Sequence, residues 1–312
     1  MSVRSHSKAY ECWLTYAPLE DVNLVKQYQE KFKIVLIKGD GPVMESVREE
    51  LKAGLKGILG IEAVITTDNN QDATVLVMKT DQEPVKSLLT DDEIRKLAGE
   101  GFLLKTTVYE DKEVIIVTAK SERGIFYGTF RLLKQLRMGK DLSHLYHLSN
   151  PSSPMRMINQ WDNLDGSIER GYAGNSIFYK NNELTENLER IKDYARLLAS
   201  VGLNSVVINN VNVHQEETRL ITDRLDMVKT IADIFRKYGI VTFLSINFAS
   251  PVELGGLDTA DPLNEDVKKW WKDIVANIYA EIPDFGGFLV KADSEHRPGP
   301  FTYNRDHADG AN

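Results

Sequence analysis

The second half of the chain alternates apolar, strand-like stretches with amphipathic, helix-like stretches, and no other feature constrains the fold as strongly. Strands are expected at 155–163, 204–210, 240–248 and 285–293. Helices are expected between them, at 187–202, 224–239 and 266–282. Near-continuous apolar strands that are separated by amphipathic helices indicate a parallel sheet with helices packed on its faces. The pattern therefore predicts a series of consecutive β/α units.

Each of these expected strands has a polar residue at or next to its end. The four residues are Asn163, Asn210, Asn247 and Asp293. A (β/α)8 barrel places such residues around its active-site mouth, at the carboxyl ends of the strands. A complete barrel takes about 250 residues, and 149–312 supplies fewer. We therefore predict the first half of a (β/α)8 TIM barrel, with about four strands; a smaller open sheet is the alternative.

The first half of the chain mixes short strands and helices. Strands are expected at 33–39, 62–68 and 73–80, helices at 43–59, 91–101 and 121–139, and a hairpin over 102–120 that turns at 110–112. This pattern predicts a two-layer α/β domain with its helices largely on one face. Because a polar, proline-rich segment at 147–156 separates the two halves, the expected domains are 1–148 and 149–312.

Composition excludes several classes of function. The net charge of −8 and the pI near 5.4 disfavour nucleic acid as a partner. Cys12 is the only cysteine, so neither an intrachain disulfide nor a cysteine-based metal site is expected. The spacings of His214, His296 and His307 match no metal motif, and no nucleotide-binding glycine motif occurs, so no cofactor is expected. Without a signal-type start or a long apolar run, we expect a cytoplasmic protein that does not interact with membranes.

The stretch LVKADSEHRPGP (289–300) places Lys291, Asp293 and Glu295 in alternation after an apolar run. If the strand continues, these three side chains share one face, where two carboxylates and an ammonium are costly unless something requires them. One interpretation is a carboxylic acid for proton transfer beside a cation for an anionic substrate group. The alternative is a solvated strand end with a local ion pair. Because Asp293 and Glu295 are only two apart, a second carboxylate would have to come from another strand to flank a sugar bond.

Aromatic and amide residues follow the first two expected strands of this half. The sequence Trp161-Asp162-Asn163 ends the first one. The Trp161 indole either packs in the core or forms the floor of a sugar site, where neighbouring amides and carboxylates bind hydroxyl groups. The asparagines that end the second strand, at 209, 210 and 212, either form a turn cluster or need buried hydrogen-bond partners.

The segment INQWDNLDGSIERGYAGNSIF (158–178) resembles the first barrel strand and loop of the α-glucuronidases of glycoside hydrolase family 67. The resemblance continues through 190–213, 244–263 and 288–312, and the first half is similar to the family's N-terminal, hexosaminidase-type α/β domain. It implies an inverting, metal-independent hydrolysis that removes α-1,2-linked (4-O-methyl)glucuronic acid from the terminal xylose of xylooligosaccharides. The implied substrates are small acidic xylooligosaccharides, the aldouronic acids of xylan degradation.

The resemblance also implies roles for individual residues. Glu295 matches the general acid that protonates the departing glycosidic oxygen, and Lys291 matches a residue that pairs with the uronate carboxylate. Trp161 matches an aromatic residue that packs on the sugar, and Val211 an apolar wall of the same pocket. The residues that remain as supporting candidates are Asp162, Asn163, Asn210 and Asp293. The family's base carboxylates lie beyond the equivalent of Asn312, so the chain alone is expected to be inactive, and a homodimer is expected only of a full-length parent.

The sequence departs from the family pattern at three positions. Gln160 stands where histidine is expected, Asn304 where glycine is usual, and His296 at a variable position. Two other functions are considered: a non-catalytic truncated copy that binds uronates weakly, and a hexosaminidase-like glycosidase with the same two-domain plan. The second uses an adjacent Asp-Glu pair, whereas Ser294 separates the two carboxylates here, and Lys291 suits an acidic sugar better.

Overall fold

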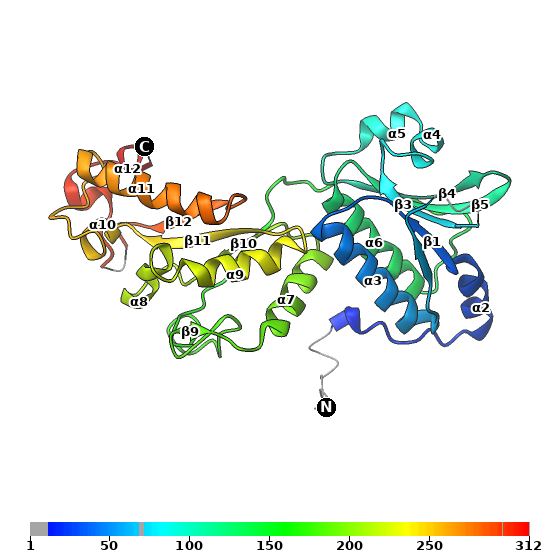
Figure 1. The fold of residues 1–312 in the computed structure, drawn as a ribbon, viewed down its shortest axis with the longest axis horizontal. Helices are drawn as coiled ribbons and strands as arrows, with labels where there is room; N and C mark the ends of the chain where they lie inside the picture. Colours follow the sequence, from blue (N-terminus) through cyan, green and yellow to red (C-terminus); the bar gives the residue numbers. More distant parts are fainter. Residues whose placement is uncertain (1–11, 69–71, 295, 312) are drawn as a thin grey trace. The chain divides into compact units, whose positions relative to one another are not determined.

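The computed structural model describes residues 12–68, 72–294 and 296–311 (Figure 1). The chain divides into two compact units. The first unit comprises Met1–Pro154, Arg196–Gly202 and Lys237–Gly239, and the second comprises Met155–Ala195, Leu203–Arg236 and Ile240–Asn312. The domain bounds that were expected from the sequence, 1–148 and 149–312, stay a prediction. Cys12 begins a short 3-10 helix, η1 (Cys12–Thr15).

The first unit contains a six-stranded sheet with the order β2-β1-β3-β5-β4-β6. Its strands are β1 (Ile34–Ile37), β2 (Val64–Thr66), β3 (Val75–Lys79), β4 (Phe102–Tyr109), β5 (Lys112–Ala119) and β6 (Tyr146–Ser149). Its helices are α2 (Val22–Lys31), α3 (Pro42–Leu59), α4 (Val85–Leu88), α5 (Asp91–Lys96) and α6 (Glu122–Arg137). Strands β2, β1, β3 and β5 are parallel, whereas β4 pairs antiparallel with β5 and β6.

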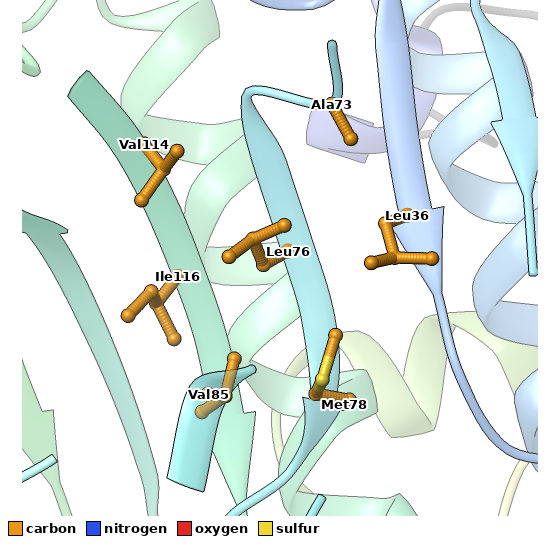
Figure 2. Close-up of a cluster of buried hydrophobic side chains, with 7 residues drawn as sticks. All are labelled: Leu36, Ala73, Leu76, Met78, Val85, Val114 and Ile116. Atoms are coloured by element: carbon orange, nitrogen blue, oxygen red, sulfur yellow. The ribbon is translucent and has the colours of Figure 1, made fainter. Parts of the chain in front are cut away.

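Apolar side chains cover both faces of this sheet. The long helices α3 and α6 pack against each other on one face, where a Cβ at Gly54 would lie 2.6 Å from the Leu133 side chain. Only glycine therefore allows the two helices to approach so closely. Figure 2 shows the buried cluster of the other face, formed by Leu36, Ala73, Leu76, Met78, Val85, Val114 and Ile116. Because Val85 belongs to α4, that short helix covers part of the second face.

The second unit contains a four-stranded sheet with the order β12-β11-β10-β7, in which all neighbours are parallel. Its strands are β7 (Met157–Asn159), β10 (Ser205–Ile208), β11 (Val241–Asn247) and β12 (Gly287–Lys291), and a small hairpin joins β8 (Tyr179–Lys180) to β9 (Glu183–Leu184). The long helices that connect the strands are α7 (Leu188–Ser200), α9 (Leu225–Arg236) and α11 (Glu265–Glu281). The short helices are α8 (Gln215–Thr218), η2 (Arg219–Ile221), α10 (Ser250–Glu253), η3 (Pro300–Tyr303) and α12 (His307–Ala311).

Strands that are parallel, adjacent in chain order and joined by helices form the first half of a (β/α)8 barrel, which confirms the predicted fold class. Strand β10 is buried along its whole length, as a strand covered on both faces requires. Among the described residues, no helix has the length and apolar character needed to cross a membrane.

The last strand ends earlier than the sequence predicts. Strand β12 stops at Lys291, and Asp293 adopts a left-handed backbone conformation with φ 53°. A residue with positive φ cannot continue a strand. The expectation that Lys291, Asp293 and Glu295 share one strand face is therefore wrong for Asp293, and Glu295 lies outside the described residues.

Candidate functional site

The carboxyl ends of the four parallel strands lie at one edge of the second sheet. The register pairs Asn159 with Val207, Ile208 with Leu244, and Asn247 with Lys291. The last residues of the strands and the loops that follow them are therefore brought to the same edge. They include all the site residues predicted from the sequence, apart from Glu295: Trp161, Asp162, Asn163, Asn210, Val211, Lys291 and Asp293. Trp161 and Val211 are half-buried there.

Asp162 fixes the loop that follows β7. Its carboxylate is completely buried and accepts hydrogen bonds from Ser176 Oγ at 2.5 Å, Gln160 Nε2 at 2.6 Å and the Ile177 amide at 2.9 Å. Both carboxylate oxygens are thus engaged, and buried carboxylates need such donors. The role of Asp162 in the structure is to hold residues 176–178 against the strand end.

Gln160 completes the same buried network. Its amide nitrogen donates to Asp162, and its Oε1 accepts from the Tyr194 hydroxyl of α7 at 2.8 Å. An amide suits this place because it donates to one partner and accepts from another at the same time. The departure from histidine at Gln160 is therefore accommodated by one donated and one accepted hydrogen bond. Sequence reasoning missed Ser176 and Tyr194, because both lie far from Asp162 in the chain.

Because of the Tyr194 hydroxyl, the folding stability changes with pH in the alkaline range. Burial, with the Asp162 carboxylate as a smaller cause, raises the pKa of Tyr194 to about 12. The folded state then holds the phenol proton more tightly than the unfolded state, in which the pKa is about 10. This contribution to stability is full below pH 10 and is lost as the pH rises from 10 to 12.

We therefore expect the wild type and Tyr194→Phe to differ most in free energy of unfolding near neutral pH. The difference should shrink above about pH 10, because only the wild type loses the stabilisation of the phenol. Urea titrations from about pH 8 to about pH 11.5 measure this difference in free energy of unfolding. The contributions of the other tyrosines are the same in both proteins and therefore cancel. A difference that stays constant over this range would contradict the assignment.

The asparagines at the strand ends are hydrogen-bonded to one another. Asn163 Oδ1 accepts from Asn210 Nδ2 at 2.9 Å, and both amides donate to the Glu169 carbonyl oxygen. Asn210 Oδ1 accepts from the backbone N–H of Asn212 at 2.9 Å. Asn209 has φ 76° and donates to the Ser245 carbonyl at 3.1 Å. The asparagines thus form both a turn and a buried hydrogen-bond network, which are the two interpretations that the sequence left open.

Lys291 and Asp293 have separate surroundings. Lys291 Nζ donates to Asn212 Oδ1 at 2.7 Å. Asp293 accepts from the Phe301 amide at 3.2 Å and from Thr302 Oγ1 at 3.4 Å. A Cβ at Gly299 would collide with the Asp293 carboxylate, so glycine is needed for this close approach. Asp293 therefore holds the segment that follows Glu295.

A pocket of about 600 Å³ lies between the loop after β7 and the start of α8. It is lined by Asn163, Asp165, Ser167, Glu169, Arg170, Gly171, Asn182, His214, Gln215, Glu216 and Glu217. Glu217 is 4% exposed and accepts from the Leu164 amide at 2.8 Å. The sequence shows these residues only as a polar loop, so the pocket was not predicted. Within the described part of the chain, no group of three or more His, Cys, Asp or Glu side chains is arranged to hold a metal ion.

Two solved structures illustrate the similarity of the fold. A family GH115 4-O-methyl-alpha-glucuronidase with specificity for decorated arabinogalactans superimposes with a TM-score of 0.57 and 17% identity, over 85% of this chain and 36% of that chain. A GH20 exo beta-N-acetylglucosaminidase from Vibrio harveyi superimposes with a TM-score of 0.51 and 13% identity, over 88% of this chain and 45% of that chain. These similarities show the fold alone, an N-terminal α/β unit followed by part of a (β/α)8 barrel.

The family follows from the sequence itself. The model described as "Glycosyl hydrolase family 67 N-terminus" matches residues 12–132, and that of the family 67 middle domain matches 135–312. Alpha-glucuronidase A from Emericella nidulans is 42% identical over 310 residues, which covers 96% of this chain and 35% of that protein. The chain belongs to glycoside hydrolase family 67. It spans about a third of the length of this relative.

Proposed function

We propose that this chain supplies the acid and the uronate-binding half of an α-glucuronidase site. The proposed reaction removes α-1,2-linked (4-O-methyl)glucuronic acid from the terminal xylose of xylooligosaccharides, as a step of xylan degradation. Family membership supports the reaction class, and the name of the Emericella nidulans relative supports the sugar. The observation that carries the proposal is the Lys291 ammonium at the carboxyl end of β12, where a barrel builds its site.

The proposed mechanism divides the chemistry between two carboxyl groups. Glu295 gives its proton to the glycosidic oxygen as the bond to the anomeric carbon breaks. Water attacks that carbon from the opposite face and loses a proton to a base about 6.5–9.5 Å from the acid, which inverts the configuration. Residues outside this chain are proposed to supply that base. A cytoplasmic location, where short oligosaccharides would be the substrates, remains part of the proposal.

A chimera tests the proposal because the chain covers only part of its relative. Residues 1–312 would replace the matched third of the Emericella nidulans protein, and the remaining two thirds would be kept. Release of glucuronate from aldotriouronic acid by the purified chimera is the expected result. A folded chimera that releases N-acetylglucosamine from a β-linked substrate would favour the hexosaminidase-like alternative. One that binds glucuronate without turnover would favour a non-catalytic binder.

In this chimera, Lys291→Ala is expected to cost mainly uronate recognition. An ammonium that pairs with a carboxylate contributes about 1.5–3 kcal/mol, so the preference for glucuronide over glucoside should fall by about 10–100-fold. The measurement is the ratio of kcat/KM for matched aryl α-glucuronide and α-glucoside substrates. Lys180→Ala, which removes an exposed lysine of the hairpin strand β8, is the matched control. An unaltered preference in Lys291→Ala would contradict the assignment.

A further inference from the structure

A directed chain of hydrogen bonds connects the ends of three strands in the second unit. Lys291 Nζ donates to Asn212 Oδ1 at 2.7 Å, and the backbone N–H of Asn212 donates to Asn210 Oδ1 at 2.9 Å. Asn210 Nδ2 then donates to Asn163 Oδ1 at 2.9 Å. In the sheet order, β11 lies between β12 and β10, so the Lys291 side chain reaches over the end of β11 to meet Asn212.

The asparagines of this chain are buried and cannot easily reorient. Asn163, Asn210 and Asn212 are 4%, 0% and 7% exposed. The amide of Asn163 is anchored at its far end by Ser167 Oγ at 2.8 Å and by the Glu169 carbonyl at 2.9 Å. A buried polar group that loses a partner costs about 1–3 kcal/mol. The network therefore fixes the backbone at Asn212, from which the largely buried side chain reaches Lys291 Nζ.

The chemical identity of Asn212 matters as much as its position. An amide oxygen accepts a hydrogen bond from an ammonium but carries no charge. An aspartate at 212 would accept the same hydrogen bond and would also compete with a substrate carboxylate for the positive charge of Lys291. A neutral acceptor orients the ammonium without neutralising its charge.

We propose that Asn212 is a positioning residue, which fixes the Lys291 ammonium for a uronate carboxylate, and that Asn210 and Asn163 hold Asn212 for this purpose. The inference rests on the proposed function, because it takes Lys291 as the uronate-binding cation. The inference adds Asn212 as a neutral partner of Lys291. Replacing Asn212 by the charged isostere aspartate should remove recognition of the uronate while the fold is kept.

The test uses the 312-residue chain with Asn212→Ala and Asn212→Asp. Gln215→Glu is the matched control, since it adds one negative charge at the exposed first residue of α8, in the same connection between β10 and α9. The 15N signal of the Lys291 ammonium, assigned by its loss in Lys291→Arg, reports whether the ammonium is held. Titration with glucuronate and with glucose, followed by NMR, reports recognition. The tryptophan fluorescence of each variant checks that the fold is kept.

The proposal predicts that Asn212→Ala broadens or abolishes the ammonium signal and weakens glucuronate binding by about threefold to tenfold. Asn212→Asp should keep the signal but weaken glucuronate binding by at least about tenfold, with glucose unaffected. Gln215→Glu should behave as the wild type. An Asn212→Asp variant that binds glucuronate normally, or an unchanged ammonium signal in Asn212→Ala, would overturn the role of Asn212. A wild type in which Asn212 orders the ammonium but glucuronate does not bind would instead overturn the proposed function.

Discussion

Glu295→Ala in the chimera is expected to slow the release of glucuronate from aldotriouronic acid by about 10²–10⁴-fold, which is the range that general acid catalysis contributes. The reason is the leaving group. A xylose hydroxyl departs poorly unless it is protonated as the bond breaks, whereas an activated nitrophenolate departs without help. The same variant should therefore lose far less activity on a nitrophenyl α-glucuronide.

The comparison of the two substrates is measured as kcat/KM for each. A variant that has only lost structure or substrate binding loses activity on both in the same proportion, so the ratio separates the acid role from these causes. Equal losses on the two substrates would remove Glu295 from the role of acid and leave its segment without a catalytic function.

Asp162→Ala is expected to cost the largest amount of stability of any single change at the strand ends, about 3–5 kcal/mol. The substitution removes an acceptor that is completely buried and leaves the Gln160 amide, the Ser176 hydroxyl and the Ile177 amide without it. Urea unfolding of the 312-residue chain, followed by tryptophan fluorescence, measures the loss. Trp161, Trp270 and Trp271 all belong to the second unit, so the signal reports mainly on that unit.

Asp165→Ala is the matched control in the same loop. The Asp165 side chain is exposed and, among the described residues, accepts hydrogen bonds from the backbone amide and the hydroxyl of Ser167. Because an exposed acceptor is readily replaced by water, the expected loss is below about 1 kcal/mol. Similar losses for the two variants would show that the Asp162 network does not stabilise the loop.

Periodicity predicts the elements of the second unit well, because they are long and amphipathic or continuously apolar. The helix expected at 224–239 is α9, and the strand expected at 204–210 is β10. Strand ends were predicted less well. The strand expected at 155–163 contains only β7, because from Gln160 on the side chains turn to partners in the loop and in α7. Such partners are tertiary and leave no local pattern.

The sequence predicted which residues lie at the site, but not which of them form hydrogen bonds with one another. Polar residues at strand ends predicted that Asn210 and Lys291 belong to one edge of the sheet, and the structure places them there. The hydrogen bond from Lys291 to Asn212 joins residues that are 79 positions apart and passes over another strand. No spacing rule describes that contact, since it depends on the order of strands in the sheet. The anchoring role of Asp293 was missed for another reason: the strand was expected to continue through it, whereas its positive φ ends the strand and its partners lie in the loop that follows.

The stereochemistry of the product most directly tests whether the acid lies in this chain and the base lies outside it. The chimera and the 312-residue chain would each be incubated with aldotriouronic acid, and the first anomer of glucuronate would be followed by 1H NMR before mutarotation. We predict that the chimera releases β-glucuronate, because water attacks opposite the departing xylose, and that the chain alone releases none. Release of α-glucuronate by the chimera, or turnover by the chain alone, would contradict a site whose acid lies in this chain and whose base lies elsewhere.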